Sequence, residues 1–116
     1  MLARGQRMRS GDDFRHTIRR GAKGAQPTLV AHVLMGTSVP GTGGPTSVGF
    51  VVSKAVGSAV DRNRVKRQLR HLMRDRVDAL PSGSRVVVRA LPAAHDAGST
   101  TLAEHLDAAL ARAGAR

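Results

Sequence analysis

The chain has 116 residues, of which 19 are Lys or Arg and 8 are Asp or Glu, so its formal net charge is +11 at pH 7. A charge of that size indicates a polyanionic partner, either nucleic acid or an anionic membrane. Membrane is the weaker choice, because no segment approaches the roughly 20 apolar residues that a span needs. The N-terminus lacks the apolar run of a secretory signal, so we expect a cytoplasmic protein.

Length and composition predict one folded domain over residues 1–116. A chain of this size can bury a modest core, and 41% hydrophobic residues argue against disorder. The absence of cysteine excludes disulfides and thiolate-metal sites. Phe14 and Phe50 are the only aromatic residues among Phe, Tyr and Trp. That argues against a module that binds single strands mainly by stacking bases on aromatic rings.

The first third of the chain predicts a basic arm, a helix and a strand. Residues 1–9 carry three arginines and form the arm. Ser10-x-x-Asp13 is a capping box that opens a short helix, which Gly21 can end. Residues 29–35 are rich in β-branched and apolar side chains and predict a strand, with residues 23–26 as a possible short strand before it.

A loop and a second strand follow. Residues 36–45 hold four Gly and two Pro, a composition that predicts a flexible loop. Residues 47–54 predict a strand, in which Val48, Phe50 and Val52 alternate with Gly49, Val51 and Ser53, so that one side should pack against helices. A second capping box, Ser58-x-x-Asp61, then opens a basic helix that we expect Pro81 to close.

The C-terminal third predicts a strand, a loop and a final helix. Residues 84–90 form the strand and residues 92–98 the loop. Thr101-x-x-Glu104 is a third capping box, opening a helix that ends at Gly114. Its buried side is expected to carry Leu102, Leu106, Ala109 and Leu110. The resulting order, α-β-β-α-β-α with a possible early strand, predicts an α/β sandwich whose sheet is covered by helices.

The basic helix places its cations where folding alone would not select them. Arg62, Arg64 and their neighbours fall in the first two turns, where the helix dipole disfavours positive charge by a few tenths of a kcal/mol each. A ridge of cations at spacing four, where like charges repel, lies beside the apolar arc. The ridge is Arg62, Lys66, Arg70 and Arg74; the arc is Val65, Leu69, Leu72, Met73, Val77 and Leu80. A solvated basic face is the ordinary interpretation, but this arrangement favours a phosphate-binding helix.

Candidates for catalysis are few. Asp12, Asp13, Asp61 and Glu104 fit first-turn or capping positions. The five histidines, His16, His32, His71, His95 and His105, have no metal-ligand spacing. We expect His95 to be a surface residue, and His32, in the middle of a strand, to be packed or to line a cleft. The pattern therefore predicts no catalytic residue, no metal site and no bond-making chemistry by this chain alone.

The run from Val48 to Arg70 resembles the signature of the bacterial ribonuclease P protein component. Its core is Arg62-Asn63-Arg64 followed by Lys66-Arg67 and Arg70, with Ser53-Lys54 and Gly57 before it. Further matches span most of the chain: Asp13-Phe14 with Gly21, Leu2 with Arg7-Met8, and Val86-Val87-Val88 with Pro92.

The resemblance implies an α-β-β-β-α-β-α fold with a left-handed βαβ crossover, similar to a ribosomal protein domain. Handedness statistics alone favour the opposite crossover. It also implies a large catalytic RNA as partner, the two forming the ribonucleoprotein endonuclease that removes 5′ leaders from precursor tRNA. The protein is then not catalytic by itself and binds no cofactor tightly, while Mg²⁺ serves the RNA.

The resemblance also implies two groups of site residues. The contacts to the catalytic RNA are Ser53, Lys54, Arg62, Asn63, Arg64, Lys66, Arg67, Arg70 and Arg74. The leader is expected in a cleft between the first helix and the sheet, with Phe14, Ile18, His32 and Phe50 as candidates that could equally be core residues.

The chain departs from the family pattern at several positions. Ser47 stands where Arg is frequent, Ser58 replaces a common Asn, and Arg89 lies one position from a usual Arg. Ile18 and His32 occupy positions that are often aromatic. Leader contact is therefore expected to depend less on stacking and more on cations.

Three other functions compete. A ribosome-associated or other structured-RNA-binding protein without a role in tRNA maturation would share the fold and the charge. A nucleoid-type DNA-binding protein fits less well, because the sequence has no helix-turn-helix and no dimer zipper. A self-sufficient nuclease would need a carboxylate or metal cluster that the sequence lacks.

Overall fold

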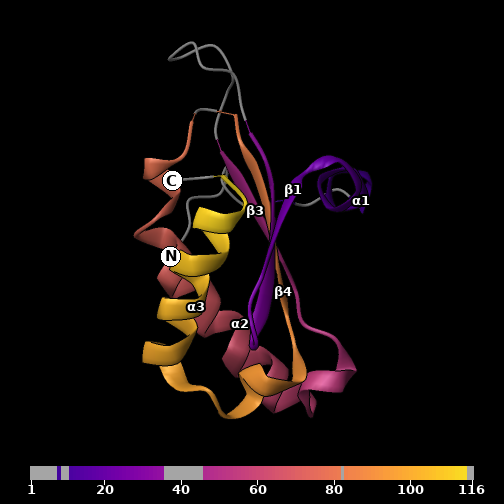
Figure 1. Cartoon of the computed structure of the whole chain (residues 1–116). Helices are drawn as coiled ribbons and strands as arrows, with labels where there is room; N and C mark the ends of the chain where they lie inside the picture. Colours follow the sequence, from indigo (N-terminus) through magenta and orange to yellow (C-terminus); the bar gives the residue numbers. More distant parts are fainter. Residues whose placement is uncertain (1–7, 9–10, 36–45, 82, 115–116) are drawn as a thin grey trace.

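The computed structural model describes residues 8, 11–35, 46–81 and 83–114. It contains three α-helices and a four-stranded sheet in those ranges (Figure 1). In chain order the elements are α1 (Gly11–Arg20), β1 (Ala22–Ala25), β2 (Leu29–Leu34), β3 (Ser47–Val51), α2 (Ala59–Arg74), β4 (Arg85–Ala90) and α3 (Gly98–Arg112). Short 3₁₀ helices occur at η2 (Lys54–Val56), η3 (Val77–Ala79) and η4 (Pro92–Asp96). The predicted arm, apart from Met8, and the predicted loop at 36–45 lie outside the described residues.

The sheet has the strand order β1-β2-β4-β3. β1 pairs antiparallel with β2, and β2 antiparallel with β4, whereas β3 and β4 are parallel neighbours. Parallel neighbours require a crossover connection, and α2 supplies it. This β3-α2-β4 unit is the crossover whose left hand the resemblance implies, and its hand stays a prediction. The possible early strand is confirmed as β1.

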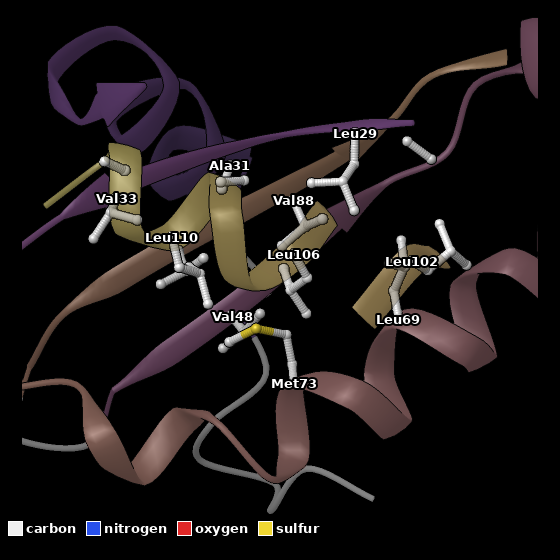
Figure 2. Packing of buried hydrophobic residues seen from close by; sticks show 14 of the residues in the cluster. Leu29, Ala31, Val33, Val48, Leu69, Met73, Val88, Leu102, Leu106 and Leu110 are labelled. Carbon is white, nitrogen blue, oxygen red and sulfur yellow. The ribbon is translucent and has the colours of Figure 1, made fainter. Parts of the chain in front are cut away.

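Helices cover both faces of the sheet. Figure 1 shows α1 on one face and α2 with α3 on the other, so the expected sandwich is confirmed. The larger core lies between the sheet and the pair α2 and α3, where the side chains labelled in Figure 2 converge. Leu69 and Met73 from α2 meet Leu102 and Leu106 from α3 there, all four fully buried. Val87 of β4, also fully buried, alternates to the α1 face.

The sequence predicted α2 and β3 too long. β3 ends at Val51 instead of residue 54, because the chain turns into the 3₁₀ helix η2. α2 ends at Arg74, and Val77 and Leu80 are buried from η3 and its C-cap rather than from one continuous helix. Frayed helix ends commonly tighten into 3₁₀ turns, so the apolar period continues although the α-helix does not.

The start of the last helix also differs from the prediction. The segment predicted as a loop at 92–98 contains η4, and α3 begins at Gly98. Thr101 therefore lies inside the helix, and its predicted capping box does not form. The four residues predicted for the buried side of α3 are all buried, because that prediction rested on the helical period and not on the cap.

Gly24 sets how closely α3 can approach the sheet. A Cβ at this position would overlap the carbonyl oxygen of Ala109 and lie 2.8 Å from its carbonyl carbon. Both neighbouring atoms belong to helix backbone, so no side-chain rotation can relieve the overlap. Glycine is therefore required for the contact between β1 and α3.

We predict that Gly24→Ala lowers the free energy of unfolding by about 1–3 kcal/mol, because the backbone of α3 must move to accept the methyl group. Denaturant unfolding measures this. Gly11→Ala is the matched control, since its Cβ would meet only the Arg15 side chain, at 3.5 Å. Equal stability of the two variants would show that the contact does not limit the packing of α3.

Candidate RNA interface

A complete capping box begins α2, as the sequence predicted. The Asp61 N–H donates to Ser58 Oγ at 3.2 Å, and the Ser58 N–H donates to the Asp61 carboxylate at 3.1 Å. The Ser58 hydroxyl also donates to that carboxylate at 2.9 Å. These hydrogen bonds, the one from the Ser58 hydroxyl first, lower the pKa of Asp61, so its negative charge is maintained at the start of the helix.

Burial of a narrow apolar stripe turns the cations of α2 outward. Val65, Leu69 and Met73 are fully buried. Of the seven predicted contact residues on α2, three are exposed and four are half-buried: Asn63, Arg67 and Arg74 are exposed, and Arg62, Arg64, Lys66 and Arg70 are half-buried. The helix therefore presents a continuous basic surface beside its buried stripe.

Ser53 and Lys54 extend this basic surface beyond the helix. Both are exposed, and they lie in the turn that connects β3 with the start of α2. Their position follows from the crossover, which brings the chain from the sheet edge directly to the helix N-terminus. The predicted RNA-contact residues thus lie on one helix and the turn before it.

Lys66 and Arg70 line a pocket at the outer edge of the sheet. Its volume is about 190 Å³, and its other lining residues are Met8, Phe14, Val48, Gly49 and Phe50. β3 is an edge strand, so side chains from the α1 layer and from the α2 layer can meet around it. The Met8 N–H donates to the Val48 carbonyl at 2.9 Å and covers part of that edge. Two aromatic rings beside two cations make a pocket whose chemistry suits a base with its phosphate.

Gly49 allows Phe14 to lie against the strand. A Cβ on Gly49 would overlap the Phe14 ring and lie 3.2 Å from Met8 Cβ. The ring consequently occupies the space that a side chain at position 49 would fill. Through this contact, α1 supplies one wall of the pocket and the sheet supplies the other.

Two of the four predicted cleft residues do not line this pocket. Phe14 and Phe50 do, but Ile18 is half-buried elsewhere on α1, and His32 is only 4% exposed. Of the two positions that the sequence allowed for His32, packed or lining a cleft, the structure shows the packed one, because β2 is a central strand that helices cover on both faces. Burial chiefly, with the charges of Arg89 and Lys23, lowers the pKa of His32.

The interface between α1 and the sheet contains buried polar atoms. Neither ring nitrogen of His32 nor Thr17 Oγ1 has a hydrogen-bond partner among the described residues. Buried polar atoms of this kind weaken packing, since each costs about 1–3 kcal/mol when unpaired.

Arg64, one of the predicted RNA contacts, also forms contacts within the protein. One guanidinium nitrogen donates to the His95 carbonyl at 2.6 Å, and another lies 3.4 Å from the Asp61 carboxylate. The His95 ring itself lies 3.2 Å from Asp61 and 2.7 Å from Asp96. His95 therefore contacts the basic helix. Sequence reasoning missed this link because its residues are 31 positions apart and Asp61 was fully explained as a cap.

The described residues offer little for metal chemistry or for membrane insertion. Among them, no group of three or more His, Asp or Glu side chains could hold a metal ion. Mg²⁺ therefore finds no clustered ligands in this part of the chain. None of the helices in the described ranges is long and apolar enough to cross a membrane.

Known proteins resemble this chain in sequence as well as in fold. The family model described as Ribonuclease P matches residues 2–114. The ribonuclease P protein component of Streptomyces avermitilis is 56% identical, over 97% of this chain and 94% of the relative. That of Mycolicibacterium gilvum is 46% identical, over 100% and 92%.

Solved structures agree at the level of the fold. The RNase P protein of Staphylococcus aureus superposes with a TM-score of 0.79 at 23% identity, covering 95% of this chain and 96% of that one. The protein from Thermotoga maritima gives 0.69 at 24% identity, covering 86% and 90%. With the family model matching nearly the whole length, the chain belongs to the ribonuclease P protein component family.

Proposed function

We propose that this chain is the cytoplasmic protein subunit of ribonuclease P, which binds the catalytic RNA and the 5′ leader of precursor tRNA. In that role it assists the RNA-catalysed endonucleolytic removal of the leader. The observation that carries the proposal is the basic surface of α2 running into a pocket that α1 and β3 complete. Membership of the ribonuclease P protein component family supports the RNA of ribonuclease P as one partner.

The cations of α2 and its preceding turn that form no ion pair in the described ranges are assigned to the catalytic RNA. Arg67 and Arg70 form no ion pair within the described part of the chain, so their charges are available to phosphates. Cations in the first turns oppose the helix dipole, and docked phosphates relieve that unfavourable term. The contact is largely electrostatic and must therefore weaken steeply as salt increases.

The pocket is assigned to the leader. Phe14 and Phe50 offer ring surfaces to an unstacked base, while Lys66 and Arg70 supply positive charge for its phosphates. Lys66 and Arg70 belong to α2 as well, so one helix would contact both the catalytic RNA and the leader. The protein could then align the two RNAs with each other.

Bond cleavage is assigned to the RNA and its Mg²⁺ ions. The described residues provide no cluster of metal ligands. The contribution of the protein is binding and orientation, which lower the cost of bringing the substrate to the catalytic RNA.

We predict that the double substitution Arg67→Ala with Arg70→Ala weakens binding to the catalytic RNA. The slope of log affinity against log salt should become shallower by about 0.9 for each phosphate that the variant no longer neutralises. Filter binding over a salt series measures it. Arg112→Ala is the control, because Arg112 also carries a positive charge but is exposed at the far end of α3. An unchanged slope in the double variant would contradict the assignment of α2.

We predict that the purified, RNA-free protein does not cleave precursor tRNA in the presence of Mg²⁺. Addition of the catalytic RNA at low Mg²⁺ should restore leader removal, giving the mature 5′ end. Gel analysis of the 5′ product measures both. Specific cleavage by the protein alone would contradict the assignment of bond cleavage to the RNA. Failure of the protein to stimulate the RNA would instead favour a structured-RNA-binding protein outside tRNA maturation.

We predict that Phe14→Leu reduces binding of precursor tRNA by the reconstituted particle and leaves mature tRNA binding little changed. Leucine preserves most of the packing against Gly49 but has no ring, and stacking is worth about 1–3 kcal/mol per base. Ile18→Val is the control on the same helix outside the pocket. An equal reduction for both tRNAs, or the same reduction in the control, would remove Phe14 from the leader site.

A further inference from the structure

We propose that His95 is a positioning residue for RNA binding. Together with Asp61 it fixes Arg64 and the start of α2, and protonation of its ring increases the affinity for RNA. The proposal rests on the proposed function of α2 as the RNA-binding helix. It concerns residues outside the pocket and outside the exposed cations already assigned.

The Asp61 carboxylate contacts Ser58, Arg64 and His95. It accepts two hydrogen bonds from Ser58, lies 3.4 Å from the Arg64 guanidinium and lies 3.2 Å from the His95 ring. Its side chain is only 25% exposed. One carboxylate thus joins the cap of α2, a signature arginine and the turn after β4.

η4 holds Arg64 from the opposite side. The His95 carbonyl accepts from the Arg64 guanidinium at 2.6 Å, while the His95 ring contacts Asp61 on the same helix. A close approach at Gly57 makes room for this contact, because a Cβ there would lie 3.0 Å from His95 Cδ2 and 2.8 Å from the Asp61 carboxylate. The backbone and the side chain of one residue therefore both fasten η4 to the helix N-terminus.

The two carboxylates beside His95 favour its protonated form. Asp61 and Arg64 face it from α2, Asp96 from η4 itself, and Lys54 belongs to η2, which packs against η4. The first turn of α3, which follows η4, contains no charged side chain. Hydrogen bonds to Asp96 and then to Asp61 raise the pKa of His95 above its ordinary 6.5.

The direction of the pH effect on RNA binding follows from the raised pKa of His95. Because the folded-state pKa is raised, the favourable contribution of protonated His95 is fully present below 6.5 and is lost as the pH rises through the folded-state value. Protonated His95 cancels the charge of Asp61 beside Arg62 and Arg64. Loss of the proton removes one positive charge from beside Asp61, at the end of the helix that faces phosphates. RNA binding and His95 protonation should therefore favour each other.

The test is the affinity for the ribonuclease P catalytic RNA at pH of about 6 and about 8.5, on either side of ordinary histidine titration, at constant ionic strength. The wild-type protein should bind about two- to five-fold more tightly at the lower pH, the size expected for one partly exposed charge. His95→Gln retains a donor toward Asp61 but does not titrate. It should show no such pH dependence and match the wild-type affinity at the higher pH.

His71→Gln is the matched control. His71 is exposed on the same helix and, among the described residues, has no hydrogen bond or ion pair with η4, so this variant should keep the wild-type pH profile. Asp61→Asn is the second variant: the asparagine side-chain oxygen can still accept from the Ser58 N–H but carries no charge, so the pH dependence should shrink. Circular dichroism on each variant verifies the fold, and Asp61→Asn decides the question if His95→Gln does not fold.

The outcomes separate the two proposals. A wild-type pH dependence that persists in His95→Gln, or that disappears in His71→Gln, would overturn the role of His95. Tight RNA binding without any pH dependence would overturn it as well, while leaving the function of α2 intact. Failure of the wild-type protein to bind the catalytic RNA at either pH would overturn the proposed function instead.

Discussion

Burial of one narrow stripe of α2 decides where every cation of the basic helix can point. Val65, Leu69 and Met73 are fully buried against the sheet and α3, and this fixes the rotation of the helix about its axis. The charged residues between them can then lie only on the rest of the helix circumference, away from the core. The core and the proposed RNA-binding surface therefore depend on the same constraint: apolar burial supplies the stability, and the orientation of the cations follows from it.

The position of β3 at the edge of the sheet extends that surface into a pocket. An interior strand is covered from both sides, as β2 is, and its side chains cannot reach ligands. Around an edge strand, α1 and α2 approach each other from opposite layers, so Phe14 and Lys66 line one cavity. The parallel pairing of β3 with β4 requires the crossover that brings α2 to this edge.

Local sequence patterns predicted the secondary structure correctly where helical periodicity and capping depend on only a few neighbouring residues. Ser58 and Asp61 form their capping box, and the buried residues of α3 agree with the helical period. The errors lie where local rules compete with packing. Thr101 carries a capping pattern but lies inside α3, and Val77 is buried from η3 instead of from a longer α2. An apolar period persists through a 3₁₀ turn, so the sequence alone cannot place the end of the helix.

The sequence by itself determined the net charge, the basic signature of α2 and the family to which that signature belongs, because these depend on residue identity and short spacing. Only the tertiary structure decided which of those residues are free. Arg64 is held by Asp61 and by the His95 carbonyl, and His32 is buried beneath α1, because contacts between distant segments depend on how the layers pack. Periodicity reports which face of an element is apolar, but the partner that covers that face is set by the fold.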